Sequence, residues 1–255
     1  HHMSARYLAE RSVDSYWRYY QIHYPIEELA SARGGRRSPL YPLLAARNAV
    51  FGSRFGWERP NWFAPPGTEA FDTPSFEGRP NWFGSVATEC KAARERAVLI
   101  DQSSFSKYEI SGPGAFTALQ RLAANDLDRP AGALIYTQLC NERGGIEADL
   151  TFVRLDENRF YMVTGSAFGV RDTAWITRHL PADGSVTLQD LTSARATINL
   201  AGPLSRRILE KVADGDVGNA AFPYMTARSL RIGYAPVLAL RVTYLGELGW
   251  ELHLP

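Results

Sequence analysis

A tyrosine and an aspartate fall in neighbouring stretches of alternating residues, where they could act on one ligand. The segment at residues 134–165 reads LIYTQLCNERGGIEADLTFVRLDENRFYMVTG. Its alternation predicts three strands, Ile135–Cys140, Ile146–Leu155 and Arg159–Thr164, joined by the turn sequences NERG and DEN. Asp149 lies inside the apolar middle strand, and carboxylates are rarely buried without a partner. The pattern therefore predicts a functional carboxylate at this position.

The position of the turn predicts which residue faces Asp149 across the hairpin. If Asn141–Gly144 form the loop, Cys140 pairs with Gly145, and Tyr136 lies directly opposite Asp149. Opposed residues share a face of the sheet, with Cβ atoms ~5 Å apart. A carboxylate beside a phenol indicates a polar-ligand site with electrostatic or acid–base assistance. The alternative is that Asp149 only accepts structural hydrogen bonds.

A second pair of candidate residues flanks a glycine-rich turn close to residue 255. The segment RVTYLGELGWELHLP predicts a strand, a turn at 245–249 and a second strand. Alternation places Glu251 and His253 on one face, and the core residues of the strand on the other, namely Trp250, Leu252 and Leu254. Tyr244 ends the incoming strand, so it and Glu251 are expected to approach a ligand from opposite the first pair. The alternative for Glu251 is a solvated strand residue.

Other catalytic and metal-binding patterns are absent from the sequence. There is no G-x-S-x-G motif and no H-E-x-x-H motif. Apart from His1 and His2, the histidines are His23, His179 and His253. No two of them are separated by the short spacing typical of metal-ligand pairs. His179 is expected to be exposed at the C-terminal end of a helix. Cys90 and Cys140 stand outside any C-x-x-C pattern, so we expect neither a disulfide framework nor a thiolate metal site.

The composition predicts a soluble globular protein. Of the 255 residues, 45% are hydrophobic and 22% are charged, and the net charge is +1. No apolar run approaches the ~20 residues of a membrane span, and nothing suggests a clustered basic surface. We therefore expect neither a nucleic-acid nor a membrane partner. The cysteine pattern indicates a reducing compartment, the cytoplasm of a bacterium or the mitochondrial matrix of a eukaryote.

The first 83 residues differ in composition and pattern from the rest of the chain. Residues 5–21 predict an amphipathic helix, with an apolar stripe at Val13, Tyr16, Trp17 and Tyr20. In the Gly-, Pro- and aromatic-rich stretch that follows, RPNWF occurs at 59–63 and again at 79–83. Proline in each copy argues against a central strand, so two paired irregular elements are expected. Trp62 and Trp82 are expected to pack in a core or interface, and stacking on a ligand is the alternative.

Two later segments share one layout and predict a duplicated α+β unit. YEISGPGAFTALQRL and TINLAGPLSRRILEK each combine a β-rich run, a Gly-Pro turn and a helical pattern. Proline suits the first helical position, because its missing N–H would be unpaired there. The expected core-facing stripes are Phe116, Leu119 and Ala123 in the first helix and Leu204, Ile208 and Val212 in the second. The Gly-Pro-Gly at 112–114 lacks the G-x-G-x-x-G spacing of a dinucleotide site.

Taken in order, these segments resemble the aminomethyltransferase (glycine-cleavage T-protein) family of tetrahydrofolate-binding domains. The resemblance rests on LIDQSSFSKYEISGPGA, IYTQLCNERGGIEADLTF, INLAGPLSRRIL and YLGELGWEL. Two further stretches, RSPLYPLL and VFGSRFGWERPNWF, are similar to the connection between the flavin-binding and folate-binding halves of FAD-dependent dimethylglycine and sarcosine dehydrogenases.

The resemblance implies an α+β fold built from duplicated antiparallel-sheet-plus-helix lobes. Further strands of the family, which close a C-terminal barrel, are expected beyond residue 255. We expect residues 1–3 to be a tag remnant and 4–83 to be a connecting segment from a flavin-dependent half. Residues 84–255 are expected to form the tetrahydrofolate-binding domain, incomplete at its C-terminal end. FAD would then bind only in the flavin half of a longer enzyme.

The resemblance also assigns roles to individual residues. Asp149 would be the catalytic residue, and no metal ligand is implied. The folate-contacting residues would be Tyr136, Thr151, Gly165, Tyr244, Glu251 and Phe105. Phe105 departs from the family pattern, because this chain has Ser-Ser-Phe where the family usually has Ser-His-Met. A pterin presents a row of N–H donors that a carboxylate accepts well.

The implied reaction is one-carbon transfer from a methylated amine. Tetrahydrofolate would capture an iminium or formaldehyde-level carbon and become 5,10-methylenetetrahydrofolate. One alternative is an S- or O-demethylase of the same superfamily, which passes a methyl group to tetrahydrofolate. Others are a non-catalytic folate-binding module and an inactive fragment. Folate-binding iron–sulfur assembly proteins carry a cysteine motif that YLGELGWE lacks.

Overall fold

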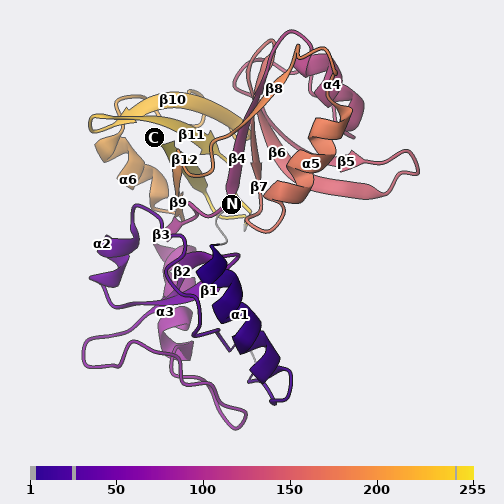
Figure 1. Cartoon of the computed structure of the whole chain (residues 1–255). Helices are drawn as coiled ribbons and strands as arrows, with labels where there is room; N and C mark the ends of the chain where they lie inside the picture. The colour runs from indigo at the N-terminus through magenta and orange to yellow at the C-terminus, as the bar shows by residue number, and fades with distance from the viewer. Residues whose placement is uncertain (1–3, 25–26, 245) are drawn as a thin grey trace. The chain divides into compact units, whose positions relative to one another are not determined.

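The chain folds into two compact units, His1–Ala92 and Ala93–Pro255. The computed structural model, labelled in Figure 1, describes residues 4–24, 27–244 and 246–255. The expected tag remnant at 1–3 therefore lies outside the described residues. Helix α3, Phe83–Glu95, carries the boundary between the units, and the domain division expected at residue 84 stays a prediction. Among the described helices, none has the length and apolar character needed to cross a membrane.

The first unit begins with helix α1, Ala5–Arg18, which confirms the predicted helix but ends before residue 21. Its first turn is capped by Ser4, whose side-chain oxygen accepts a hydrogen bond from the backbone N–H of Tyr7. The predicted apolar stripe is exposed along its length: Val13, Tyr16, Trp17 and Tyr20. The helix therefore presents a largely exposed aromatic face.

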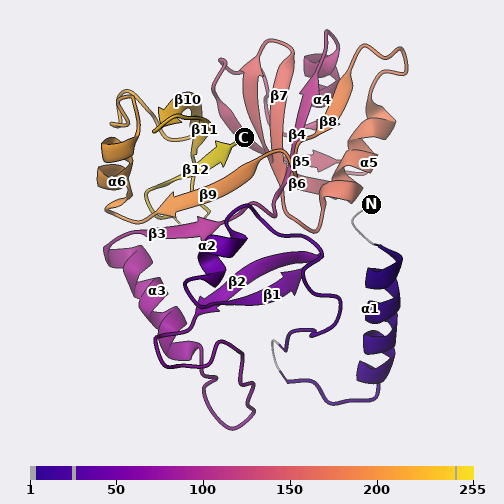
Figure 2. The ribbon, with the colours of Figure 1, turned by 60° about the vertical axis from the view of Figure 1, so that its left-hand side comes forward.

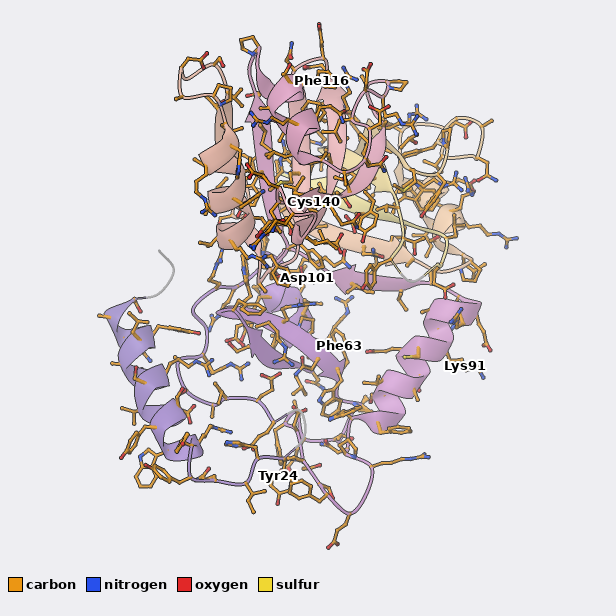
Figure 3. All side chains as sticks on the ribbon, turned by 90° about the vertical axis from the view of Figure 1, so that its right-hand side faces the viewer. Tyr24, Phe63, Lys91, Asp101, Phe116 and Cys140 are labelled. Carbon is orange, nitrogen blue, oxygen red and sulfur yellow. The ribbon has the colours of Figure 1, made fainter. Side chains whose placement is uncertain are left out.

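A two-stranded antiparallel hairpin forms the centre of this unit. The hairpin consists of β1, Ala49–Arg54, and β2, Trp57–Phe63, and the short helix α2, Tyr41–Ala45, precedes it. Trp62 is 1% exposed in a small core with Val50 and Ala64, as the packing interpretation of this tryptophan predicts. Phe63, labelled in Figure 3, is the last residue of β2.

The two RPNWF copies are not a pair of irregular elements, so that prediction was wrong. The first copy lies within strand β2, and the second runs into the start of α3. Proline is tolerated in the first copy because a two-stranded sheet has only edge strands, and Pro60 sits at a register irregularity opposite Phe51. Neither copy is a central strand, as predicted. Trp82 packs against the same small core as Trp62.

The second unit contains two five-stranded antiparallel sheets (Figures 1 and 2). The first sheet has the order β5-β6-β7-β4-β8, with strands Leu134–Cys140, Ile146–Asp156, Arg159–Thr164, Ser106–Ser111 and Thr187–Asp190. The second has the order β10-β11-β12-β9-β3, with strands Thr226–Ile232, Ala235–Arg241, Gly249–Leu254, Ala196–Ala201 and Val98–Asp101. The helices are α4, Ala115–Leu122, α5, Gly169–His179, and α6, Ser205–Val212.

The two sheets repeat one topology, which confirms the predicted duplication. In the first lobe, β4 leads through a Gly-Pro turn to α4, and three consecutive antiparallel strands follow, the last of which, β7, pairs with β4. In the second lobe, β9 leads to α6 and then to β10, β11 and β12, and β12 pairs with β9. In each lobe, the last of these strands therefore pairs with the strand that precedes the helix.

Glycine is required at both Gly-Pro turns. Gly112 has a φ of 129° and Gly202 a φ of 115°, a region that residues with a Cβ rarely adopt. A Cβ on Gly112 would lie 2.0 Å from the carbonyl oxygen of Ser185, and one on Gly202 would lie 2.7 Å from that of Arg96. The prolines precede the helices, which begin at Ala115 and Ser205, so the expectation of proline at the first helical position was wrong.

Three apolar clusters hold this unit together. Helices α4 and α5 cover one face of the first sheet, where Phe116, labelled in Figure 3, packs beside the buried Leu119. Helix α6 covers the outer face of the second sheet above Trp250. A third cluster joins the inner faces of the two sheets, with Val153 and Tyr161 on one side and Leu240 on the other. The unit is therefore a layered sandwich with both sheets buried in part on both faces.

The predicted stripe of helix α6 was wrong, whereas that of α4 was largely right. Leu204, Ile208 and Val212 are exposed, and the buried residues of α6 are Ser205 and Leu209. One residue shifts a helix face by about 100°. Ser205 is drawn inward because its hydroxyl donates to the backbone carbonyl of Leu248, 3.0 Å away.

Candidate functional site

The β5–β6 hairpin places its polar residues at the rim of the inter-sheet core. The predicted strands and the predicted alternation are confirmed: Ala148, Leu150 and Phe152 face the helix-covered core. On the opposite face, Val153 is buried in the inter-sheet cluster, while Asp149 is exposed beyond it. The expectation of a buried carboxylate was therefore wrong. The Asp149 side chain is accessible to solvent.

The register of the hairpin differs by two residues from the one predicted. Tyr136 pairs with Thr151, and Gln138 pairs with Asp149. The loop is one residue longer than expected, because the N–H of Asn141 donates to the carbonyl oxygen of Gly145. A bulge next to Cys140 adds the second residue. Because the slip is even, all of these side chains keep the predicted face.

Asp149 and Tyr136 are diagonal neighbours that interact across this face. The amide Nε2 of Gln138 donates to Oδ1 of Asp149 at 3.3 Å. The pKa of the Tyr136 phenol is raised, chiefly by its hydrogen-bonding interaction with the Asp149 carboxylate. The nearby Tyr244 raises the pKa of Tyr136 further through its charge. Tyr136 thus remains a protonated hydrogen-bond donor, and 52% of it is exposed.

Two further predicted residues lie along the same row of the first sheet. Strand pairing aligns Ser106 with Thr164, and the same register carried one residue further aligns Phe105 with Gly165. Phe105 is partly buried against the inter-sheet cluster. A Cβ on Gly165 would come within 3.1 Å of the Phe168 ring, so glycine leaves room there. The apolar ring of Phe105 and the side-chain-free position at Gly165 therefore lie in the same row of the sheet as Asp149.

Glu251 lies on the facing sheet, on the inner surface of β12. The predicted alternation is confirmed, because Trp250 and Leu252 pack in the outer core. The Glu251 side chain is 21% exposed, and it pairs in register with Asn199 on β9. Asn199 is 8% exposed, and its Oδ1 has no hydrogen-bond partner among the described residues. A buried acceptor without a partner is costly unless a ligand supplies a donor.

Tyr244 lies in the connection between β11 and β12, whose residue 245 is outside the described residues. It is 97% exposed, and its contact with a folate stays a prediction. The described residues contain no group of three or more His, Cys, Asp or Glu side chains that could hold a metal ion.

Sequence reasoning missed two residues of this region, Asn199 and His253. Asn199 sits in an apolar run and carries no motif, so only the strand pairing with Glu251 reveals it. His253 was judged only by its spacing from other histidines, although alternation already placed it on the Glu251 face. In the structure it is fully buried, with Nε2 3.3 Å from Oε2 of Glu251. His179, by contrast, is exposed at the end of α5, as predicted.

Comparison with known proteins identifies the family. Residues 40–255 match the family described as the GCVT N-terminal domain. This chain belongs to that family. Residues 1–38 match a second family, the FAD dependent oxidoreductase central domain. The resemblance predicted from the motifs is confirmed, while the expected domain boundary at residue 84 stays a prediction.

The relatives of this GCVT-family chain are longer proteins. The chain is 39% identical to 4-methylaminobutanoate oxidase (formaldehyde-forming) of Paenarthrobacter nicotinovorans, over 99% of the chain and 30% of the relative. It is 34% identical to human mitochondrial sarcosine dehydrogenase, over 98% of the chain and 31% of the relative. The chain thus spans less than a third of the length of these curated relatives.

The GCVT fold itself is shown by a solved relative. The crystal structure of glycine cleavage system aminomethyltransferase T from Bartonella henselae matches 86% of this chain and 54% of its own, with a TM-score of 0.68 and 27% identity. The predicted α+β fold of duplicated antiparallel lobes is therefore confirmed. The described residues form open sheets and no closed barrel.

Proposed function

We propose that this GCVT-family chain binds tetrahydrofolate and serves as the one-carbon transfer domain of a demethylating amine dehydrogenase of the dimethylglycine or sarcosine type. The observation that carries the proposal is the accessible Asp149 carboxylate, held beside Tyr136 at the rim of the two facing sheets. An exposed carboxylate suits a nitrogen heterocycle whose edge carries N–H donors. The family match over most of the chain supports the same ligand class.

The described residues supply matching partners for a pterin. Its amidine-like edge carries N–H donors, which the Glu251 carboxylate accepts, while Asp149 faces the reacting nitrogen. Asn199 offers a further acceptor next to Glu251, and this acceptor has no partner in the described part of the chain. Phe105 supplies an apolar contact for the ring system. Thr151, partly exposed in the same row as Tyr136, completes the polar face.

In the proposed reaction one folate nitrogen attacks the iminium carbon, and a second folate nitrogen then displaces the amine, or water when the carbon comes from formaldehyde, to give 5,10-methylenetetrahydrofolate. Of the two N–H protons lost from an iminium reaction, one leaves with the amine and the other is accepted by a base. Asp149 stabilises the positive charge that develops on the reacting nitrogen and accepts its proton. Tyr136 donates to Asp149 and fixes its direction. Holding the two reactants together supplies much of the acceleration.

The oxidised amine is proposed to come from a flavin-dependent half. FAD, when bound in such a half, would supply the oxidation of the methylated amine. Residues 1–38 match the central domain of FAD dependent oxidoreductases, and helix α1 within this stretch exposes an aromatic face. We propose this face as the contact with the flavin-dependent half. Relatives of known compartment include a mitochondrial enzyme, so the mitochondrial matrix or the bacterial cytoplasm remains the proposed location.

The test is Asp149→Asn in the enzyme that carries both halves. The rate of 5,10-methylenetetrahydrofolate formation from dimethylglycine or sarcosine is expected to fall by ~100-fold or more, the size of a lost general base. Amine oxidation by the flavin is expected to continue. The matched control is Asp156→Asn, at the far end of the same strand, where Asp156 pairs with Arg159 on the surface. Unchanged product formation in Asp149→Asn would refute the proposal.

A second product is favoured by one comparison. The relative with 39% identity is described as formaldehyde-forming, so this chain could serve an enzyme that releases the carbon as formaldehyde. Product analysis distinguishes the candidates: 5,10-methylenetetrahydrofolate supports carbon capture, and free formaldehyde in the presence of saturating tetrahydrofolate supports release. 5-Methyltetrahydrofolate would indicate the demethylase alternative, folate binding without any product a non-catalytic module, and absence of folate binding an inactive fragment.

A further inference from the structure

His253 occupies a fully buried position at the junction of the two sheets. Its Nε2 lies 3.3 Å from Oε2 of Glu251, two residues earlier on the same strand face. Its Nδ1 lies 3.0 Å from the hydroxyl of Tyr161 on β7 and 3.2 Å from Oγ1 of Thr197 on β9. Tyr161 also packs edge-to-face on the imidazole, with ring centroids 5.3 Å apart. Both nitrogens are therefore engaged, and the ring cannot turn without breaking contacts.

The chemistry of these partners selects one form of the imidazole. An ionised carboxylate only accepts hydrogen bonds, so the proton must sit on Nε2 and point to Glu251. Nδ1 is then an acceptor with one lone pair, and the Tyr161 hydroxyl at 3.0 Å is its nearer donor, ahead of Thr197 at 3.2 Å. Burial raises the pKa of the Tyr161 phenol, so its hydroxyl keeps the proton that it donates. The result is a directional chain from Tyr161 through His253 to Glu251.

The surroundings keep this imidazole neutral. Burial lowers the pKa of His253, and the cations Lys107 and Arg195 lower it further, against the opposing influence of Glu251. Lys107 comes from β4 and is itself fully buried, with Nζ donating to the carbonyl oxygen of Ser103 at 2.8 Å. From β11, the register partner of His253 is the apolar Leu238. Glu109 of β4 pairs with Tyr161 and raises the pKa of that phenol, so it favours the protonated hydroxyl that faces His253.

We propose that His253 is a positioning residue, which fixes the Glu251 carboxylate for the pterin by donating from Nε2 while Tyr161 holds Nδ1. This inference rests on the proposed folate-binding function for the role of Glu251, but the hydrogen-bond chain itself does not. The chain also ties β7 of the first sheet to β12 of the second. β7 pairs with β6, the strand that carries Asp149. The Asp149 and Glu251 carboxylates are therefore connected through paired strands and this hydrogen-bond chain.

The hydrogen-bond chain is tested by nitrogen-15 NMR of the histidines in the 255-residue chain. At pH 7, His253 is expected to show a protonated Nε2 and an unprotonated Nδ1. Glu251→Gln is expected to shift the Nε2 resonance of His253 and to leave His179 unchanged. A protonated Nδ1 in His253, or an Nε2 resonance that ignores Glu251→Gln, would overturn the proposal whether or not the chain binds folate.

The positioning role is tested by calorimetric titration with 5-formyltetrahydrofolate. His253→Leu is expected to weaken binding about tenfold, roughly the effect of one hydrogen bond to a charged group. His253→Gln, which keeps an N–H near the Nε2 position, is expected to bind within about threefold of the wild type. In the Glu251→Gln background the Leu substitution is expected to have little further effect.

The controls separate this inference from the proposed function. His179→Leu, an exposed histidine at the end of α5, is expected to leave binding unchanged. Equal weakening by His253→Leu with and without Glu251→Gln would show a merely structural role and refute positioning. If the wild-type chain gives no heat with the folate, the proposed function fails, and the NMR result alone decides on the hydrogen-bond chain.

Discussion

At the scale of the residue, the character of Asp149 follows from what surrounds it. It is exposed, it accepts from Gln138 at 3.3 Å, and it holds Tyr136 in its protonated form by raising the phenol pKa. Its exposure leaves the carboxylate open to a ligand, and the neighbouring donors of Gln138 and Tyr136 direct it. Its role as a base stays part of the proposed function.

The residue-scale prediction concerns the hydroxyl of Tyr136. Tyr136→Phe keeps the ring but removes the donor beside Asp149, so 5-formyltetrahydrofolate binding should weaken by about threefold to tenfold, as for a single net hydrogen bond. Calorimetric titration measures the effect. Tyr234→Phe, a fully exposed tyrosine in the β10–β11 turn, is the matched control and should bind as the wild type. An equal loss in both variants would contradict a specific role for Tyr136.

At the scale of the element, the two lobes share a fold but not a site. The pairing of β4 with β7 corresponds to that of β9 with β12, so Tyr161 and Glu251 occupy equivalent positions on the two inner faces. On the middle strands, Val153 pairs with Tyr161 and Leu240 pairs with Glu251. Duplication thus gives two similar sheets that face each other. Differences at a few equivalent positions, such as Tyr161 and Glu251, give the two inner faces different polarity.

The element-scale prediction concerns the Gly-Pro turn that starts helix α4. Gly112→Ala forces a Cβ to within 2.0 Å of the Ser185 carbonyl oxygen at a φ of 129°, so the backbone must move. We expect the free energy of unfolding to fall by roughly 2–4 kcal/mol, since strain and displacement add. Chemical denaturation followed by circular dichroism measures the change.

Gly215→Ala is the control for this substitution. Gly215 has open space around its Cβ position and no positive φ, so the change should lie within about 0.5 kcal/mol of the wild type. If Gly112→Ala proves as mild as this control, then the turn can relax and the argument from close approach fails.

At the scale of the whole second unit, stability depends on an inter-sheet layer that is apolar at its centre and polar around His253. Val153 and Leu240 form the apolar part, whereas Lys107, His253 and Tyr161 bring polar groups into the same layer. Buried polar groups are tolerated there because each of these three has a hydrogen-bond partner. A proton added to His253 would be compensated only in part, by the Glu251 carboxylate.

The prediction at this scale is the pH dependence of unfolding. Because burial lowers the pKa of His253, the unfolded chain takes up a proton more readily than the folded chain. The free energy of unfolding should therefore fall as the pH drops below about 6.5, until the lower pKa of the folded form is passed. Denaturation curves between pH 8 and 5.5 measure it. His253→Gln should lose less stability over this range than the wild type, and parallel curves for the two would contradict the assignment.

The sequence by itself determined the strands, their alternation and the duplication. Local patterns encode these features directly: the period of two in residues 146–155 and the Gly-Pro turns at Gly112 and Gly202 need no knowledge of distant residues. The same local information, through motif order, predicted the family and the candidate residues Asp149, Tyr136 and Glu251. The roles of these residues in folate chemistry stay predictions.

Only the tertiary structure decided register, burial and partners. The Tyr136–Asp149 register depended on one loop residue and one bulge, which are set by hydrogen bonds of Asn141 and not by composition. The buried side of α6 depended on a contact between Ser205 and Leu248, distant in sequence. His253 acquired its partners only when β7, β9 and β12 came together. Contacts between distant segments produce no periodic pattern in the sequence, so they can be identified only in the folded structure.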